Sequence, residues 1–185
     1  MKIMMAGDET YGLARAIKER WTDTLSCSRK TGYDLTDPQV WSRVAEESLN
    51  YEVFINCSAL WRFNQSLLVA KVWELWDSKK KSGQMIHIGS TADTGVRPGA
   101  WLYPVEKAAL KSLNRNLSYS AIGNGRIRST LLSTGYISTP KVEEKHPDKL
   151  KLDPYYIVDI IDWVIKQPKT VNINEISLDP IQAKL

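Results

Sequence analysis

The chain has 185 residues, 43% of them hydrophobic and 25% charged, and its 25 basic and 21 acidic side chains give a net charge of +4. This length suits one domain, residues 1–185, with a sizeable core, and the composition is typical of a soluble globular protein. The modest charge comes without a recognised nucleic-acid-binding motif, so it fits small anionic partners and does not favour nucleic acid.

The cysteines, histidines and apolar segments argue against disulfide-rich, metal-binding, membrane-spanning and secreted proteins. Cys27 and Cys57 do not form a C-x-x-C pair, and only two histidines accompany them, so neither a disulfide framework nor a metal site is expected. No apolar run reaches the ~18 residues of a membrane span. The N-terminal apolar stretch meets charge at Asp8, too early for a secretion signal. We expect a cytoplasmic protein without a membrane partner.

Short strand-like segments alternate with helical ones along the chain. Strands are expected within residues 2–7, 24–29, 51–59, 84–90, 126–133 and 170–176, and helices at 12–21, after Asp37-Pro38, and at 64–80, 103–119 and 154–166. This alternation predicts right-handed crossovers and an α/β fold. We therefore expect a doubly wound, mainly parallel Rossmann-type sheet of about six or seven strands, with helices on both faces.

Ligands of such sheets bind across the carboxyl ends of the strands. After the first strand, a turn enters a helix through Gly7, Thr10, Tyr11, Gly12 and Leu13. The free N–H groups of a helix start can bind a diphosphate, and glycine permits close approach, although two glycines can also serve turn geometry alone. The two acids of this loop would repel phosphate unless they face solvent or cap the helix.

The segment after the second strand consists of Ser28, Arg29 and Lys30. It lacks the acid that would accept a bond from a ribose 2′-hydroxyl, and its cations suit a 2′-phosphate. As a cofactor site, this segment favours NADP(H) over NAD(H). As surface structure, it is an exposed basic turn.

A serine, a tyrosine and a lysine stand in order at Ser90, Tyr103 and Lys107. Tyrosine and lysine at i and i+4 share one helix face, where an ammonium stabilises a phenolate. Pro104 lacks an N–H and biases the preceding residue away from helical angles, which places Tyr103 at the helix entrance. The same spacing also occurs in packing helices with a solvated lysine.

Together these motifs resemble the short-chain dehydrogenase/reductase family over nearly the whole chain. Asp34, Leu35 and Thr36 look like its Asp-x-Thr segment beside the adenine. Two further segments are similar to its Asn-Asn-Ala-Gly and Pro-Gly segments, the second contacting nicotinamide: Asn56, Cys57 and Ser58, then Gly135, Ile137 and Thr139. The resemblance implies a cofactor site that includes these residues together with Tyr103 and Lys107.

The resemblance implies hydride transfer between nicotinamide and a small carbonyl or hydroxyl compound. Tyr103 would be the general acid/base, Lys107 would assist it, and Ser90 would bind the substrate oxygen. Asn64 would seat a proton-supplying water, or else cap its helix. Trp101 and Tyr136 are candidate substrate contacts. A homodimer or homotetramer is implied, paired through the helices of Asn64 and Tyr103.

Several departures leave an alternative open. The middle glycine of the phosphate loop is absent, and there is no room for a helix between Ser28 and Asp34. The substrate lid between Thr139 and Asp153 is short, and the charged stretch 141–151 is expected to be a mobile excursion. The alternative is a catalytically inactive dinucleotide-binding sensor or interaction protein of the same fold.

Overall fold

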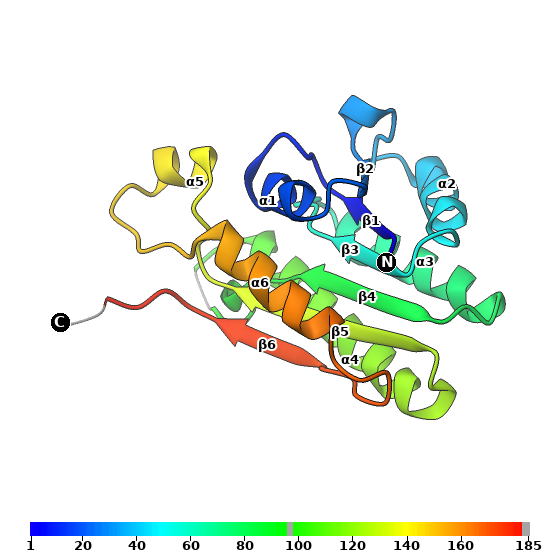
Figure 1. Ribbon diagram of the computed structural model, residues 1–185. Helices are drawn as coiled ribbons and strands as arrows, with labels where there is room; N and C mark the ends of the chain where they lie inside the picture. The colour runs from blue at the N-terminus through cyan, green and yellow to red at the C-terminus, as the bar shows by residue number, and fades with distance from the viewer. Residues whose placement is uncertain (96–97, 183–185) are drawn as a thin grey trace.

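The computed structural model describes residues 1–95 and 98–182. Its centre is a six-stranded sheet in which every neighbouring pair is parallel, in the order β2-β1-β3-β4-β5-β6 (Figure 1). The strands are β1 (Ile3–Ala6), β2 (Leu25–Cys27), β3 (Val53–Asn56), β4 (Gly83–Ile88), β5 (Ile127–Thr134) and β6 (Glu175–Leu178). The expected Rossmann-type fold class is confirmed.

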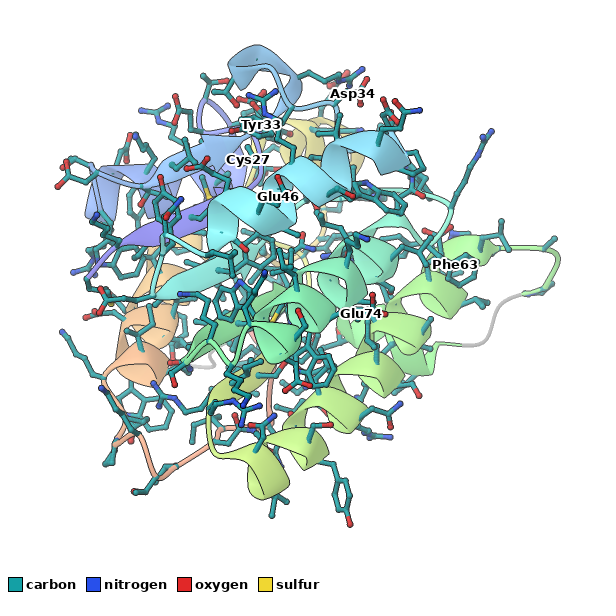
Figure 2. All side chains as sticks on the ribbon, turned by 90° about the vertical axis from the view of Figure 1, so that its right-hand side faces the viewer. Cys27, Tyr33, Asp34, Glu46, Phe63 and Glu74 are labelled. Atoms are coloured by element: carbon teal, nitrogen blue, oxygen red, sulfur yellow. The ribbon has the colours of Figure 1, made fainter. Side chains whose placement is uncertain are left out.

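Five long helices cover the two faces of the sheet. They are α1 (Gly12–Arg20), α2 (Pro38–Ser48), α3 (Asn64–Ser78), α4 (Leu102–Asn124) and α6 (Pro154–Ile165). One face packs against α1 and α6, and the other against α2, α3 and α4. Figure 2 looks onto the face covered by α2, α3 and α4, which lie side by side in that order.

Alternation along the central strands divides the core between these two layers. Met4 and Phe54 point toward α2 and α3, whereas their neighbours Met5 and Ile55 point toward α1 and α6. All four side chains are fully buried. Apolar side chains on both faces of a strand are typical of a parallel sheet covered by helices.

Two helix starts follow the same sequence device. Asp37 and Asp153 are the N-caps of α2 and α6, and each carboxylate accepts a hydrogen bond from the backbone two residues later. A proline occupies the first turn of each helix, where its missing N–H costs nothing. The sequence expectation at both positions is confirmed.

The structure contains a short helix that was not expected in the charged stretch after β5. Thr139 caps a short helix, α5 (Pro140–Lys145), so the first half of that stretch is helical. The segment is tied back to the fold by a parallel bridge between Ile137 and Leu152. Within residues 1–95 and 98–182, no helix has the length and apolar character needed to cross a membrane.

The shortened crossover after β2 is confirmed. Only a single 3₁₀ turn, η1 (Arg29–Thr31), separates β2 from the segment that leads to α2. Gly32 ends this turn with φ of 84°, a left-handed conformation that glycine adopts without strain. The chain therefore passes almost directly from β2 to Asp34.

Candidate active site

The carboxyl ends of the central strands are in register. Ala6 pairs with both Cys27 and Asn56, and Asn56 pairs with His87. The residues that follow these strands, including Gly7, therefore lie along one edge of the sheet. This is the edge at which parallel α/β sheets bind their ligands.

Tyr103 and Lys107 lie in the first turns of α4, as expected. The helix has Trp101 as its N-cap and begins at Leu102, which places Tyr103 at its entrance. The Lys107 ammonium lies 5.8 Å from the centre of the Tyr103 ring. The two side chains share one helix face, as their spacing predicts.

Lys107 is a buried cation held by neutral groups. Its Nζ donates hydrogen bonds to Gln65 Oε1 at 2.7 Å and to the Ile88 carbonyl at 3.1 Å. Burial lowers the pKa of Lys107 to about 8, while the charge of Glu106 acts in the opposite direction. The ammonium therefore titrates much closer to neutral pH than a solvated lysine does.

The residue of α3 that contacts this lysine is Gln65, which sequence reasoning missed. Asn64 starts α3 and its backbone N–H donates to the Trp61 carbonyl at 3.2 Å. Gln65 is buried, in one stripe with Leu68 and Val72. A polar side chain within an apolar helical stripe was the available sequence signal.

A small cavity of about 30 Å³ lies beside Tyr103, between the starts of α3 and α4. This volume admits water but not a substrate. The Trp61 and Trp101 rings lie 6.1 and 6.2 Å from the Tyr103 ring, between ring centres. Trp61 and Trp101, which were both expected to line a substrate pocket, thus both lie next to Tyr103.

The turn that leads from Trp61 into α3 is strained. Arg62 and Phe63 have φ of 61° and 62°, values that non-glycine residues rarely adopt. The Glu106 carboxylate accepts the Arg62 backbone N–H at 2.8 Å and holds the turn against α4. Phe63, labelled in Figure 2, is the N-cap of α3.

Ser90 follows β4 and is buried as the N-cap of a 3₁₀ turn, η2 (Thr91–Thr94). Its hydroxyl accepts a hydrogen bond from the Ala92 N–H at 3.2 Å. The turn packs against α4, and Lys111 ties Asp93 of the turn to Glu175 of β6. Ser90 and Tyr103 thus lie on two elements in direct contact.

The basic turn after β2 is partly neutralised. Lys30 Nζ lies 3.1 Å from an Asp8 carboxylate oxygen and 2.5 Å from Thr10 Oγ1. Bonds from Thr10, followed by Lys30, lower the pKa of Asp8. Arg29 and Lys30 are exposed. Asp8 therefore competes for the lysine that was expected to receive a 2′-phosphate.

Tyr11 crosses from this loop to the start of α5. Its phenol oxygen accepts a bond from the Lys141 N–H at 2.8 Å, and its hydroxyl donates to Thr139 Oγ1 at 3.4 Å. Gly12, at φ of 53°, has Thr139 so near that a Cβ would lie 2.9 Å from its methyl carbon. The loop and α5 are therefore in direct contact.

The residues at the start of α1 fit a diphosphate. Gly12 begins the helix, its first turn carries no acid, and the Tyr11 side chain does not cap it. Leu13 is buried in the core, so only its backbone is placed to contact a ligand. Free N–H groups at a helix start, without a competing carboxylate, suit an anion.

The other candidate cofactor contacts are mostly held by local bonds. Asp34 accepts bonds from the backbone and hydroxyl of Thr36, and Asn56 accepts bonds from the backbone and hydroxyl of Ser58. Leu35 is buried. These contacts order the two segments and engage the backbone N–H groups of Thr36 and Ser58.

Two further positions show why small residues stand there. A Cβ on Gly7 would lie 2.5 Å from Cys57 Sγ, and one on Gly135 would lie 2.5 Å from an Asp179 oxygen. Burial raises the pKa of the Cys57 thiol to about 12, which keeps it neutral. Close packing thus accounts for both glycines.

Of the expected substrate contacts, Tyr136 packs on His146, with ring centres 4.8 Å apart. It belongs to the segment that leads from β5 to α5. The loop from Gly95 to Gly99, another expected specificity segment, includes residues 96–97, which lie outside the described residues.

Comparisons with known proteins agree with this fold. No family model matches the chain. An uncharacterized oxidoreductase of Staphylococcus aureus is 31% identical over 104 residues, which are 56% of this chain and 45% of the relative. One of Staphylococcus saprophyticus is 31% identical over 103 residues, 55% of this chain and 44% of the relative. The match thus spans less than half the length of these relatives.

Solved structures cover nearly the whole chain. A 4-hydroxyisoleucine dehydrogenase mutant complexed with NADH and succinate has a TM-score of 0.78 at 17% identity, covering 97% of both chains. The serine dehydrogenase of Escherichia coli has a TM-score of 0.75 at 18% identity, covering 96% of this chain and 97% of that one.

The fold is therefore that of the short-chain dehydrogenases/reductases, and the resemblance drawn from the motifs is confirmed. The sequence is similar to curated oxidoreductases over slightly more than half of this chain.

Proposed function

We propose that the chain is an NADP(H)-dependent oxidoreductase that acts on a small carbonyl or hydroxyl compound. The observation that carries this proposal is the buried Lys107 ammonium beside Tyr103, at the carboxyl edge of the sheet. Burial of a lysine ammonium costs free energy, so its presence beside Tyr103 points to a function that depends on its charge. Structural neighbours with this fold hold NADH or NADP in their crystals.

The nicotinamide dinucleotide, when bound, supplies or receives the hydride. In carbonyl reduction, the Tyr103 hydroxyl donates its proton to the substrate oxygen, and the Ser90 hydroxyl donates a hydrogen bond to the same oxygen. Lys107 stabilises the phenolate that remains, because opposite charges attract strongly where water is scarce. Solvent then returns a proton to Tyr103.

The chain would hold the dinucleotide along the carboxyl edge. The start of α1, from Gly7 to Leu13, would bind the diphosphate, and Asp34 to Thr36 would lie beside the adenine. Arg29 and Lys30 support the preference for a 2′-phosphate, and Lys107 would bind the nicotinamide ribose. Lys30 would have to leave Asp8 to take part.

We further propose that the protein pairs with copies of itself through α3 and α4, as a homodimer or homotetramer. These helices expose large apolar side chains, among them Leu67, Val105, Tyr119 and Ile122. Burial of such a patch stabilises association.

A second candidate is a dinucleotide-binding sensor without catalysis. It is favoured by the loop after β1, which lacks the family's middle glycine and carries Asp8 and Glu9, and by the short segment between Thr139 and Asp153. Against it stands the Tyr103, Lys107 and Ser90 set, which binding alone does not need.

The deciding experiment measures NADPH binding by fluorescence and then NADPH oxidation with a panel of small aldehydes, ketones and 3-oxo acids. We expect turnover that Tyr103→Phe lowers at least about 100-fold, since a positioned acid contributes on that scale. Tyr156→Phe, at an exposed position of α6, should leave the rate unchanged. Binding without turnover, indifferent to Tyr103→Phe, would support the sensor.

A further inference from the structure

Gln65, on α3, contacts both Ile88 at the end of β4 and Lys107 of α4. Its side chain is 5% exposed, and both ends of its amide are used. Oε1 accepts from Lys107 Nζ at 2.7 Å, and Nε2 donates to the Ile88 carbonyl at 3.0 Å. A lysine ammonium can only donate, so this arrangement fixes which end of the amide faces it.

Gln65, Lys107 and the Ile88 carbonyl are joined to one another by hydrogen bonds. The Ile88 carbonyl accepts from both Gln65 and Lys107, so each contact supports the other. The Gln65 backbone carbonyl accepts from Asn56 Nδ2 at 3.3 Å, which ties the residue to β3 as well. Gln65 is thus held by two strands while it holds the lysine.

The groups around Lys107 leave Gln65 as its neutral polar partner on α3. Glu106 lies on the same helix as the lysine, and one of its carboxylate oxygens accepts a hydrogen bond from the Arg62 backbone N–H. The Cys57 thiol is kept neutral by burial, which raises its pKa to about 12. Tyr103 presents its ring. Without Gln65 the ammonium keeps its bond to the Ile88 carbonyl but loses its shorter one, and a buried ammonium with fewer acceptors gives up its proton more readily.

We propose that Gln65 is a positioning residue that holds Lys107 beside Tyr103 and keeps its ammonium protonated by accepting a hydrogen bond. Its kinetic consequence rests on the proposed oxidoreductase function. Its effect on Lys107 does not, because the contact exists in the protein without a substrate.

The test measures Lys107 directly. In protein labelled with ¹³C at lysine Cε, the Lys107 resonance is assigned by its loss in Lys107→Arg and followed from pH 6 to 11. We compare the unaltered chain with Gln65→Met, which keeps length but loses the acceptor, and with Gln65→Glu, which adds a charge. Gln39→Met, the same substitution at an exposed position of α2, is the matched control.

We expect Gln65→Met to lower the Lys107 pKa by at least about 1, which takes its protonated fraction at pH 8 from about one half to about one tenth. Gln65→Glu should raise that pKa by a similar amount, because a carboxylate favours the ammonium. Gln39→Met should leave it unchanged.

The proposal is overturned if folded Gln65→Met titrates Lys107 like the unaltered chain, or if Gln39→Met moves it equally. Circular dichroism and thermal melting establish that each variant is folded. If Gln65→Met does not fold, the test is whether Gln65→Glu raises the Lys107 pKa. Where turnover is found, the alkaline limb of the kcat/KM profile should move with the Lys107 pKa. If the chain has no turnover, the oxidoreductase proposal fails while the resonance still decides the role of Gln65.

Discussion

The phenol oxygen of Tyr11 accepts a hydrogen bond from the backbone N–H of Lys141, 2.8 Å away, which joins the loop after β1 to the first turn of α5. These segments are 130 residues apart in sequence. A dinucleotide that lay along the start of α1 toward Thr139 would have to displace this contact. The tyrosine also donates to Thr139 at 3.4 Å, so the contact joins two residues that the family resemblance assigns to the cofactor site.

Removal of the Tyr11 hydroxyl should tighten cofactor binding. In Tyr11→Phe, the bonds to Thr139 and Lys141 are lost, and a single hydrogen bond is worth about 1 kcal/mol net. We expect the Kd for NADPH, measured by fluorescence titration, to fall by roughly fivefold. Tyr156→Phe, at an exposed position of α6, is the control. An unchanged or weaker affinity would show that Tyr11 does not obstruct the cofactor.

Asp8 should weaken the preference for a 2′-phosphate. Asp8→Asn removes the charge that pairs with Lys30 and leaves that ammonium available. Because the pair is exposed, its contribution is modest, and we expect the ratio of NADH to NADPH dissociation constants to rise roughly fivefold. Asp23→Asn, an exposed acid after α1, should not alter the ratio. If Asp8→Asn leaves the ratio constant, Lys30 does not meet the phosphate.

Buried His87 should make the fold sensitive to acid. Burial lowers the pKa of His87 from 6.5 to about 3, so between these values only the unfolded chain binds the proton. The free energy of unfolding therefore falls as pH falls through this window, by up to about 1.4 kcal/mol per pH unit. Urea unfolding at pH 7, 6, 5 and 4 measures this slope.

The matched variants separate this histidine from the carboxylates that titrate nearby. His87→Gln should flatten the slope between pH 6 and 4, whereas His146→Gln, at an exposed position, should leave it as it was. Equal slopes in all three proteins would mean that His87 is protonated in the folded state.

Gly7 should tolerate no side chain while Cys57 is present. A Cβ there would lie 2.5 Å from Cys57 Sγ, and overpacking of this kind costs about 1–3 kcal/mol. Thermal unfolding should show Gly7→Ala destabilised, and adding Cys57→Ala should recover more than half of the loss. Gly123→Ala, in α4 with no atom near its Cβ, should instead stabilise slightly. If Gly7→Ala is as stable as Gly123→Ala, the packing argument fails.

Local patterns sufficed for most of the fold. The alternation of buried strands with helices, and the Asp-Pro starts at Asp37 and Asp153, depend on neighbouring residues and could be predicted. The α5 helix was missed because its charge suggested a mobile loop, although Thr139 followed by Pro140 is a helix start. The N-cap Thr139 and the first-turn Pro140 predict this helix better than the charge of the segment does.

The site was less predictable because its contacts join distant segments. Choosing Gln65 over Asn64 requires the helix phase, since neighbouring residues point about 100° apart. The pairing of Asp8 with Lys30 depends on β1 and β2 being adjacent. Tyr103 and Lys107 could be placed from sequence because both lie on one helix.

The short β2 strand has a consequence for how the protein behaves in concentrated solution. With one crossover missing, β2 ends the sheet on one side with three residues, and β6 ends it on the other with four. Each margin offers few unpaired N–H and C=O groups to a neighbouring molecule. Such brief margins resist edge-to-edge aggregation, so truncation of the sheet leaves little surface on which amyloid-like stacking can begin.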